Sequence, residues 1–206
     1  MTETDAQTWI SNKFGVSRGT VVARFAEILC RESSSQNLIA ASTIPTMWSR
    51  HLLDSAQLIP LVEDAPDGAW LDIGSGAGLP GIVVAALLDR EVILVEPRVK
   101  RVEFLRAAAA ELGLANVIVA HGKVENYEPN TPVAIVSARA VAELSTLFAA
   151  AYHCTASSTI WVLPKGRNAQ SEVAAARRTW QGSFHVEPSM TQPESGIVVA
   201  KGVRPK

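Results

Sequence analysis

The residues of this sequence best suited to chemistry form an acidic, glycine-rich stretch from Asp72 to Gly81, followed later by a lone acid. Within the stretch, Gly74, Gly76 and Gly78 stand at alternate positions. Glycines in this arrangement allow positive φ angles and remove the side chains that would keep a ligand away from the main chain. Glu96, at the end of the next apolar run, could accept hydrogen bonds from both hydroxyls of an adenosine ribose. The pattern therefore predicts a nucleoside-containing cofactor.

Two classes of cofactor satisfy this pattern. The segment from Gly76 to Gly81 matches the G-x-G-x-x-G fingerprint of dinucleotide-binding proteins, which leaves an NAD(P)-dependent oxidoreductase open as an alternative. Asp72, however, would lie close to the negatively charged pyrophosphate of a dinucleotide, whereas it would attract the cationic amino and sulfonium groups of S-adenosylmethionine. Together with the ribose-binding position of Glu96, this charge argument favours S-adenosylmethionine.

Basic side chains follow three other apolar runs of the chain, as Lys123, Arg139 and Lys165. If these runs are parallel strands, their carboxyl ends meet at one rim of a sheet, where ligands bind. Basic groups that converge from separate strand ends on one rim are hard to obtain from packing alone, so we expect a binding site there. The basic residues of 98–106 spread around a helix, and we expect them at the surface, with Arg101 as a candidate RNA contact.

Short apolar runs alternate with helical patterns from residue 69 onward, which predicts a doubly wound α/β sheet with helices as parallel crossovers. The expected strands are Ala69 to Ile73, Val92 to Glu96, Val117 to His121, Val133 to Ser137 and Thr159 to Leu163, with two weaker ones at Ser183 to Pro188 and Ile197 to Lys201. Residues 67–206 are expected to form one compact unit, behind a helical extension of residues 1–66 that caps the site.

Within this extension, apolar spacing predicts one helix from about Thr20 to the polar residues 32–37, and a second from Thr46 to Pro60. On the second helix, the four-residue spacing of Arg50 and Asp54 is typical of a surface ion pair, which contributes little to stability. A lone histidine such as His51 more often makes a structural hydrogen bond than performs chemistry.

Composition, charge and cysteine usage narrow the possible partners, metal sites and compartment of the protein. The chain has 206 residues, 48% of them hydrophobic, and a net charge of −1, so any nucleic acid must be held by a local basic patch. Cys30 and Cys154 lie in apolar helical patterns without metal-ligand spacing, which predicts buried thiols in a reducing compartment and no metal site. Neither a secretory signal nor a membrane-spanning run is present, so a cytoplasmic protein is expected. The basic tail from residue 201 is expected to fray.

Several blocks of the sequence resemble the RsmG (GidB) family, bacterial S-adenosylmethionine-dependent enzymes that methylate N7 of a guanine in small-subunit ribosomal RNA. The blocks are Arg50 to Ser55, Asp72 to Gly81, Lys100 to Leu105, Ser137 to Ala140, and Lys165-Gly166. The resemblance implies a Rossmann-like class I methyltransferase sheet in which the last strand is antiparallel. It also implies the small ribosomal subunit or its RNA as the partner, and we expect the enzyme to act as a monomer. A ribosome-assembly factor that keeps this fold without catalysis remains an alternative.

The resemblance also assigns residues, position by position. It places a first set around the cofactor: Gly74, Leu79, Glu96, Val124, Glu125 and Arg139. It places Lys123, Arg139 and Lys165 toward the RNA or the target base, with Arg139 and Lys165 as the catalytic candidates, and it folds Arg50 and His51 over the same rim. The sequence departs from the family pattern at Ala134, where an aspartate is usual, and at Ser195-Gly196, where an arginine or histidine commonly precedes the last strand. No general base is expected, because guanine N7 carries a free lone pair.

Overall fold

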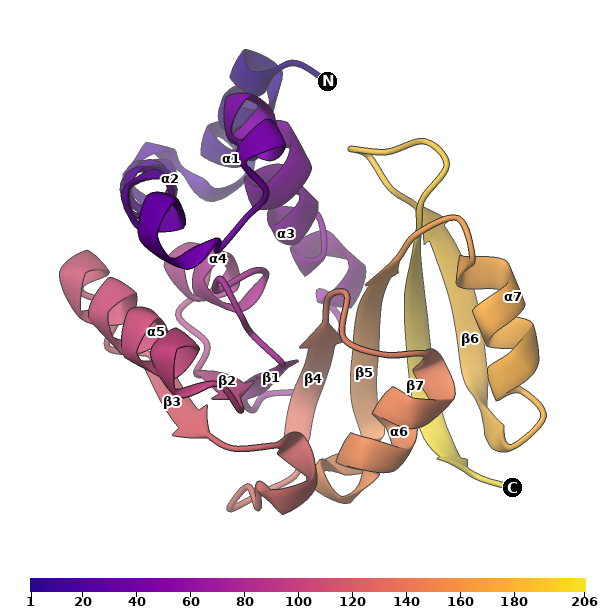
Figure 1. The fold of residues 1–206 in the computed structure, drawn as a ribbon. Coiled ribbons are helices and arrows are strands. Elements are labelled where there is room, and N and C mark those ends of the chain that lie inside the picture. Colours follow the sequence, from indigo (N-terminus) through magenta and orange to yellow (C-terminus); the bar gives the residue numbers. More distant parts are fainter.

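A seven-stranded sheet forms the centre of the computed structural model, which describes all 206 residues (Figure 1). The strand order is β3-β2-β1-β4-β5-β7-β6, and β7 runs antiparallel to both of its neighbours while the other six strands are parallel. The strands are β1 (Trp70–Ile73), β2 (Val92–Glu96), β3 (Val117–His121), β4 (Val133–Ala138), β5 (Thr155–Lys165), β6 (Trp180–Pro188) and β7 (Gly196–Pro205). The predicted mostly parallel methyltransferase sheet with an antiparallel last strand is confirmed.

The sheet is covered on both faces, which explains why its central strands β1, β2 and β4 are buried throughout and mostly apolar. In β2, Val92 and Leu94 enter one hydrophobic core, and Ile93 and Val95 enter the other. The first core lies under α4 (Gly81–Leu87) and α5 (Val99–Leu112), and the second under α6 (Leu144–Ala151) and α7 (Ala169–Ala176). Because successive side chains of a strand point to opposite faces, β1, β2, β4, β5 and β7 contribute to both cores, whereas the buried side chains of the edge strand β6 belong to the second core alone.

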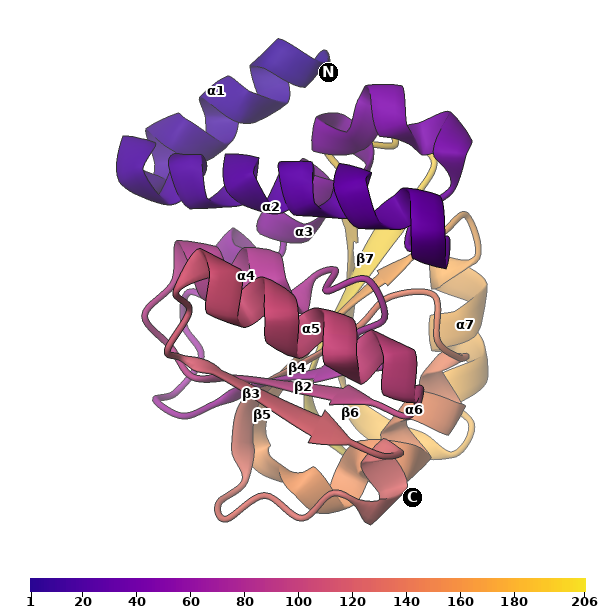
Figure 2. The same cartoon turned by 60° about the vertical axis from the view of Figure 1, so that its left-hand side comes forward.

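The N-terminal helices extend the first of these cores. Figure 2 shows α1 (Glu3–Phe14) and α2 (Val16–Gln36) above α4 and α5. Buried side chains of α2, among them Val22 and Phe25, belong to the same hydrophobic cluster as Ile82 of α4 and Phe104 of α5. The first 66 residues therefore pack on the sheet domain as an added layer.

Helix α2 differs in extent from the prediction, since it begins at Val16 and continues through the polar residues that were expected to end it. The Ser34 and Ser35 hydroxyls donate to carbonyl groups three residues earlier, which keeps this polar turn helical. Asn37, in the left-handed conformation, ends the helix.

The predicted helix from Thr46 to Pro60 is a composite of short turns. They are η1 (Ala41–Thr46, 3₁₀), η2 (Trp48–Leu53, π), α3 (Asp54–Ala56) and η3 (Ile59–Val62, 3₁₀). Glu3 of α1 accepts hydrogen bonds from the Trp48 and Ser49 backbone N–H groups, at 2.8 and 2.9 Å. These bonds satisfy donors at the start of η2 that lack partners within the turn.

Two smaller predictions were wrong. The basic tail is not frayed, because β7 continues to Pro205, which pairs with Trp180 of β6. Cys30 is exposed on α2, next to the buried face formed by Ile28 and Leu29, whereas Cys154 is buried as expected. None of the helices combines the length and the apolar character needed to cross a lipid bilayer.

Candidate functional site

The glycine loop between β1 and α4 forms one wall of a cavity of about 390 Å³. The cavity lies at the carboxyl ends of the strands and is lined by Gly74, Gly76, Leu79, Glu96 and Arg139, all of which were predicted to bind the cofactor. Four further lining residues, Asn37, Leu38, Arg98 and Val141, could not be predicted from the sequence. Both the volume and the position are typical of a small-molecule site in a doubly wound fold.

Glu96 contributes a fully buried carboxylate to this cavity. Its oxygens accept hydrogen bonds from the Gly76 backbone N–H at 2.8 Å and from the Arg98 backbone N–H and Nε at 3.0 and 2.8 Å. Burial alone would raise the pKa of Glu96, but the hydrogen bonds from Arg98 and Gly76 outweigh it and hold that pKa below its usual value. The carboxylate is therefore ionised and able to accept from the hydroxyls of a ribose.

Asp72, which was predicted to lie near the cationic groups of the cofactor, does not line the cavity itself but is buried beneath the glycine loop. The side chain is fully buried, where it accepts hydrogen bonds from Ser137 Oγ at 2.7 Å and from the Gly81 backbone N–H at 3.2 Å. Burial raises the pKa of Asp72 to about 6, despite these hydrogen bonds. Asp72 thus joins β1, β4 and the start of α4 beneath the glycine loop.

Gly78 also lies outside the cavity lining, and its role is to allow close packing. Its φ is 80°, and a Cβ atom there would stand 2.6 Å from Ile82 Cγ1 and 3.1 Å from Phe25 Cζ. The absence of a side chain at Gly78 lets α2 approach the loop. This contact between distant segments could not be predicted from the glycine spacing.

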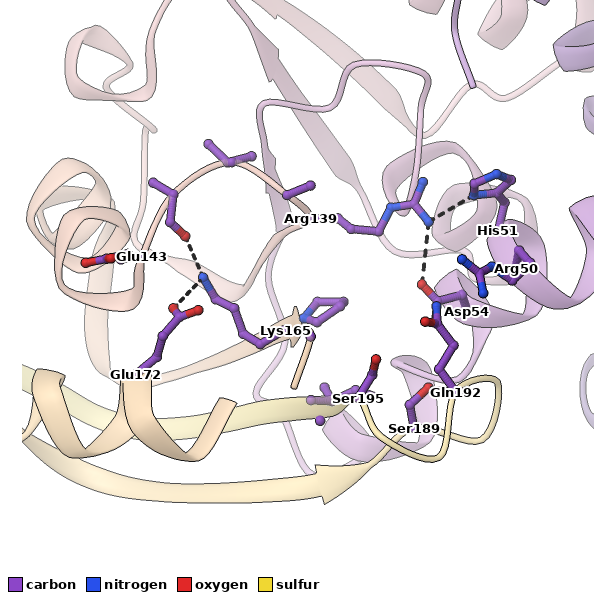
Figure 3. Close-up of a pocket in the computed structure, with 17 residues that line it drawn as sticks. Arg50, His51, Asp54, Arg139, Glu143, Lys165, Glu172, Ser189, Gln192 and Ser195 are labelled. Atoms are coloured by element: carbon purple, nitrogen blue, oxygen red, sulfur yellow. Dashed lines mark hydrogen bonds and ion pairs between the residues drawn. The ribbon is translucent and has the colours of Figure 1, made fainter. Parts of the chain in front are cut away.

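A second cavity, of about 730 Å³, lies between the carboxyl ends of β4 and β5, the amino end of the antiparallel β7, and the N-terminal segment (Figure 3). Arg139, Lys165, Arg50 and His51 line it as predicted. Several polar lining residues were not predicted, among them Asp54, Glu172, Ser189, Gln192 and Ser195. Three of these come from the loop between β6 and β7, which carried no motif.

The segment Arg139, Ala140 and Val141 belongs to the walls of both cavities. Ala140 has a φ of 55°, in the left-handed region that non-glycine residues seldom occupy. Such strain persists only where the surroundings hold the backbone, and it is frequent at functional sites. The two cavities therefore meet at the loop that follows β4.

The Arg139 guanidinium points toward the N-terminal segment (Figure 3). Its Nη1 lies 3.3 Å from His51 Nδ1 and 3.5 Å from Asp54 Oδ2. Asp54 therefore pairs with Arg139 across the fold, and the predicted surface ion pair between Arg50 and Asp54 is wrong. Asp54 is buried and its carboxylate faces Arg139 of the loop after β4, so it is not part of a surface ion pair.

His51 is neutral in this arrangement. Burial is the main cause that lowers its pKa to about 4, and the positive charges of Arg139 and Arg50 lower it further. Since Nδ1 accepts from Arg139, the ring proton resides on Nε2, which lies 2.8 Å from the Thr43 hydroxyl. The predicted structural hydrogen bond of His51 is confirmed.

Lys165 lies on the opposite side of the larger cavity and points away from Arg139 (Figure 3). Its Nζ forms an ion pair with Glu172 at 2.9 Å and donates to the Ala142 carbonyl oxygen. Glu172 also accepts from the backbone N–H of Leu144, at 3.2 Å. Lys165 therefore anchors the loop after β4 in addition to lining the cavity.

The remaining predicted residues are not brought into either site, apart from Arg101. Lys123 and Glu125 are exposed after β3 and Val124 is buried in the second core, and none of the three lines a cavity. Arg101 lines the smaller cavity, where its Nη2 donates to the Gln36 and Asn37 carbonyl oxygens, at 2.8 and 3.1 Å. These bonds make it part of the wall of the cavity and not the free surface residue that the helical pattern predicted.

Comparison with known proteins identifies the fold and the family. The family model described as "rRNA small subunit methyltransferase G" (GidB) matches residues 20–196. Proteins named "Ribosomal RNA small subunit methyltransferase G" from Sphingopyxis alaskensis and Rhizorhabdus wittichii are 47% and 44% identical to this chain. The alignments cover 99% and 100% of this chain and 88% and 95% of those proteins, respectively.

A crystal structure of a SAM-dependent methyltransferase from Aquifex aeolicus has the same fold. Its TM-score is 0.58 at 12% sequence identity, over 76% of this chain and 92% of that one. With the sequence matches covering nearly its whole length, the chain belongs to the GidB family of small-subunit ribosomal RNA methyltransferases.

Proposed function

We propose that this chain transfers a methyl group from S-adenosylmethionine to N7 of a guanine in small-subunit ribosomal RNA. The observation that carries the proposal is the meeting of two cavities at Arg139, Ala140 and Val141. One cavity has the glycine loop and buried acid suited to an adenosine-containing cofactor, and the other has the size and polarity suited to a nucleotide base. A reaction between two bound molecules requires this adjacency.

The smaller cavity would hold the cofactor. Glu96 accepts the ribose hydroxyls, and the loop backbone at Gly74 and Gly76 lies against the ligand because no side chain intervenes. The ionised fraction of Asp72, whose pKa is about 6, adds negative charge beneath the loop at neutral pH. When bound, S-adenosylmethionine supplies an electrophilic methyl group on a sulfonium, and the sulfur keeps the bonding pair when the methyl group leaves.

The larger cavity would receive the target guanine. Arg139 orients the base through its O6 edge or an adjacent phosphate, and Lys165 holds the loop against which the base lies. The lone pair of N7 forms the new bond to carbon, so no proton is removed before transfer. Catalysis then depends on orienting the base and cofactor in line, an effect that can supply several kcal/mol. A stacked or paired target must first be extruded from its helix.

The N-terminal helices complete the site in this proposal. Asn37 and Leu38 cover the smaller cavity, and Arg50 and His51 border the larger one, where Arg50 is free to contact RNA phosphates. The enzyme acts as a monomer in the cytoplasm, on the small ribosomal subunit or its RNA. Lys123, which is exposed at the same rim, is retained as an RNA contact.

The test uses methyl-labelled S-adenosylmethionine with small ribosomal subunits that lack the modification. We expect label in the small-subunit RNA with the wild-type chain and strongly reduced but still measurable labelling with Arg139→Ala, whose fold is checked by circular dichroism. Cofactor binding without transfer would support the non-catalytic assembly factor. Binding of NADH instead of S-adenosylmethionine would support the oxidoreductase alternative.

A further inference from the structure

Asp54 occupies the point where the N-terminal segment, the loop after β4 and the loop between β6 and β7 meet. Asp54 is only 9% exposed, and both of its carboxylate oxygens have partners. Oδ1 accepts from Gln57 Nε2 at 2.9 Å and from Thr191 Oγ1 at 2.7 Å. Oδ2 faces Arg139 Nη1 at 3.5 Å.

The β6–β7 loop is tied to the same segment through a second contact. Gln57 Oε1 accepts from the Met190 backbone N–H at 2.7 Å, and Gln57 Nε2 lies 3.2 Å from Ser189 Oγ. Gln57 therefore holds the loop from one side while Thr191 holds it through Asp54. This arrangement gives the buried carboxylate a fixed position, to which the guanidinium must adjust.

A buried carboxylate requires a compensating charge, and Arg139 is the cation that faces Asp54. His51, which is one turn earlier in the chain, is neutral and adds a hydrogen-bond acceptor but no charge. Asp54 and His51 together engage Nη1 of Arg139, so the rest of the guanidinium is left for a ligand where the two cavities meet.

From this geometry we infer that Asp54 is the positioning residue for Arg139, through which the N-terminal segment and the β6–β7 loop orient the guanidinium for methyl transfer. The inference rests on the proposed function. Asp54 borders the larger cavity, but its carboxylate oxygens are occupied by protein groups and are not free to bind a reactant. Its effect on the reaction is exerted through Arg139 alone.

The experiment is a double-mutant cycle with Asp54→Asn and Arg139→Ala, measured as methyl transfer to unmodified small ribosomal subunits. In the wild-type background, Asp54→Asn should lower kcat by roughly 10- to 100-fold. The KM for subunits and the Kd for S-adenosylmethionine should change by less than about threefold, since both cavities keep their walls. In the Arg139→Ala background, Asp54→Asn should have less than about a twofold further effect.

Two further variants separate positioning from folding. Thr191→Val keeps the charge of Asp54 but removes one hydrogen bond, and it should lower kcat by a smaller factor. Asp64→Asn removes a surface carboxylate that pairs with Lys201, remote from both cavities, and it should leave all constants unchanged. Equal losses from Asp54→Asn with and without Arg139, or a parallel loss of cofactor affinity, would overturn the inference.

A readout independent of catalysis distinguishes failure of this inference from failure of the proposed function. The Arg139 Nη1–H signals, followed by NMR, should be slow to exchange in the wild-type chain, where Nη1 faces Asp54, and fast in Asp54→Asn. An unchanged signal would refute the positioning role even if the chain is active. A lost signal in a chain that transfers no methyl group would support the pairing and reject the proposed function.

Discussion

Replacement of Asp72 by asparagine should change how the stability of the protein depends on pH. Asp72 is fully buried, and its pKa is raised from 3.8 to about 6, mainly by burial. The protonated form is therefore favoured in the folded state. The stability that this group contributes is complete below the unfolded-state pKa of 3.8 and is lost as the pH rises through about 6.

The magnitude follows from the shift of about two pKa units, which corresponds to about 3 kcal/mol. Asparagine at position 72 carries no charge at any pH, so the Asp72→Asn variant should lack this contribution to the pH dependence of the unfolding free energy. It also loses an acceptor for either Ser137 Oγ or the Gly81 N–H, a cost of about 1 to 3 kcal/mol that does not depend on pH. The difference in unfolding free energy between variant and wild type should therefore move by about 2 to 3 kcal/mol in favour of the variant between pH ~4 and pH ~7.5.

Urea-induced unfolding at a series of pH values, followed by tryptophan fluorescence, measures this difference directly. Because each pH compares two proteins in the same buffer, the titration of all other groups cancels. Asp89→Asn, at an exposed position, is the matched control for loss of a carboxylate and should follow the wild-type curve. A difference between Asp72→Asn and wild type that stays constant across the whole range would refute the assignment of a raised pKa to Asp72.

Three further predictions concern other parts of the site. Glu96→Gln should raise the Kd for S-adenosylmethionine by about 10- to 100-fold, because a charged acceptor contributes about 1.5 to 3 kcal/mol; calorimetry with a nearly unchanged Kd would contradict the ribose contact. Gly78→Ala should destabilise the fold by about 1 to 3 kcal/mol or more, because the new methyl group would meet Ile82 at 2.6 Å and Phe25 at 3.1 Å; chemical denaturation that gives wild-type stability would show that the loop relaxes freely. The ring signals of His51 should stay constant in NMR spectra from pH ~7.5 to pH ~5.5, because its pKa is lowered from 6.5 to about 4. The stability from burying the neutral ring is present above pH 6.5 and is lost as the pH falls toward 4, so a midpoint near 6.5 would contradict this environment.

The sequence was most informative where local pattern and chemistry agree. The seven strands lie close to the predicted ranges, because a short apolar run between turn residues is typical of a buried strand in a compact domain. The same order places Glu96 and Arg139 at the carboxyl ends of their strands, so their convergence on one cavity could be predicted from topology. The strands β5, β6 and β7 are longer than predicted, because the hydrogen bonding between neighbouring strands continues through polar residues that an apolar pattern does not include.

The parts that the sequence did not predict depend on contacts between distant segments. Asp54 appeared to be a surface partner of Arg50, because the spacing along a helix says nothing of Arg139, which lies 85 positions away. The sequence predicts Asp72 near the cationic groups of the cofactor, but it does not indicate that Ser137 and Gly81 cover the carboxylate. The polar loop with Ser189 and Thr191 carries no sequence motif, and only the structure shows that it hydrogen-bonds to the buried carboxylate of Asp54.

The central claim is the identity of the methylated atom. N7-methylguanine is cationic and labile, so borohydride and aniline treatment of the RNA cleaves the chain at that nucleotide alone. Small subunits lacking the modification, treated with this protein and S-adenosylmethionine, should give cleavage at one guanine of the small-subunit RNA, absent when the protein or the cofactor is omitted. Methyl incorporation without such cleavage, or no incorporation at all, would contradict the account.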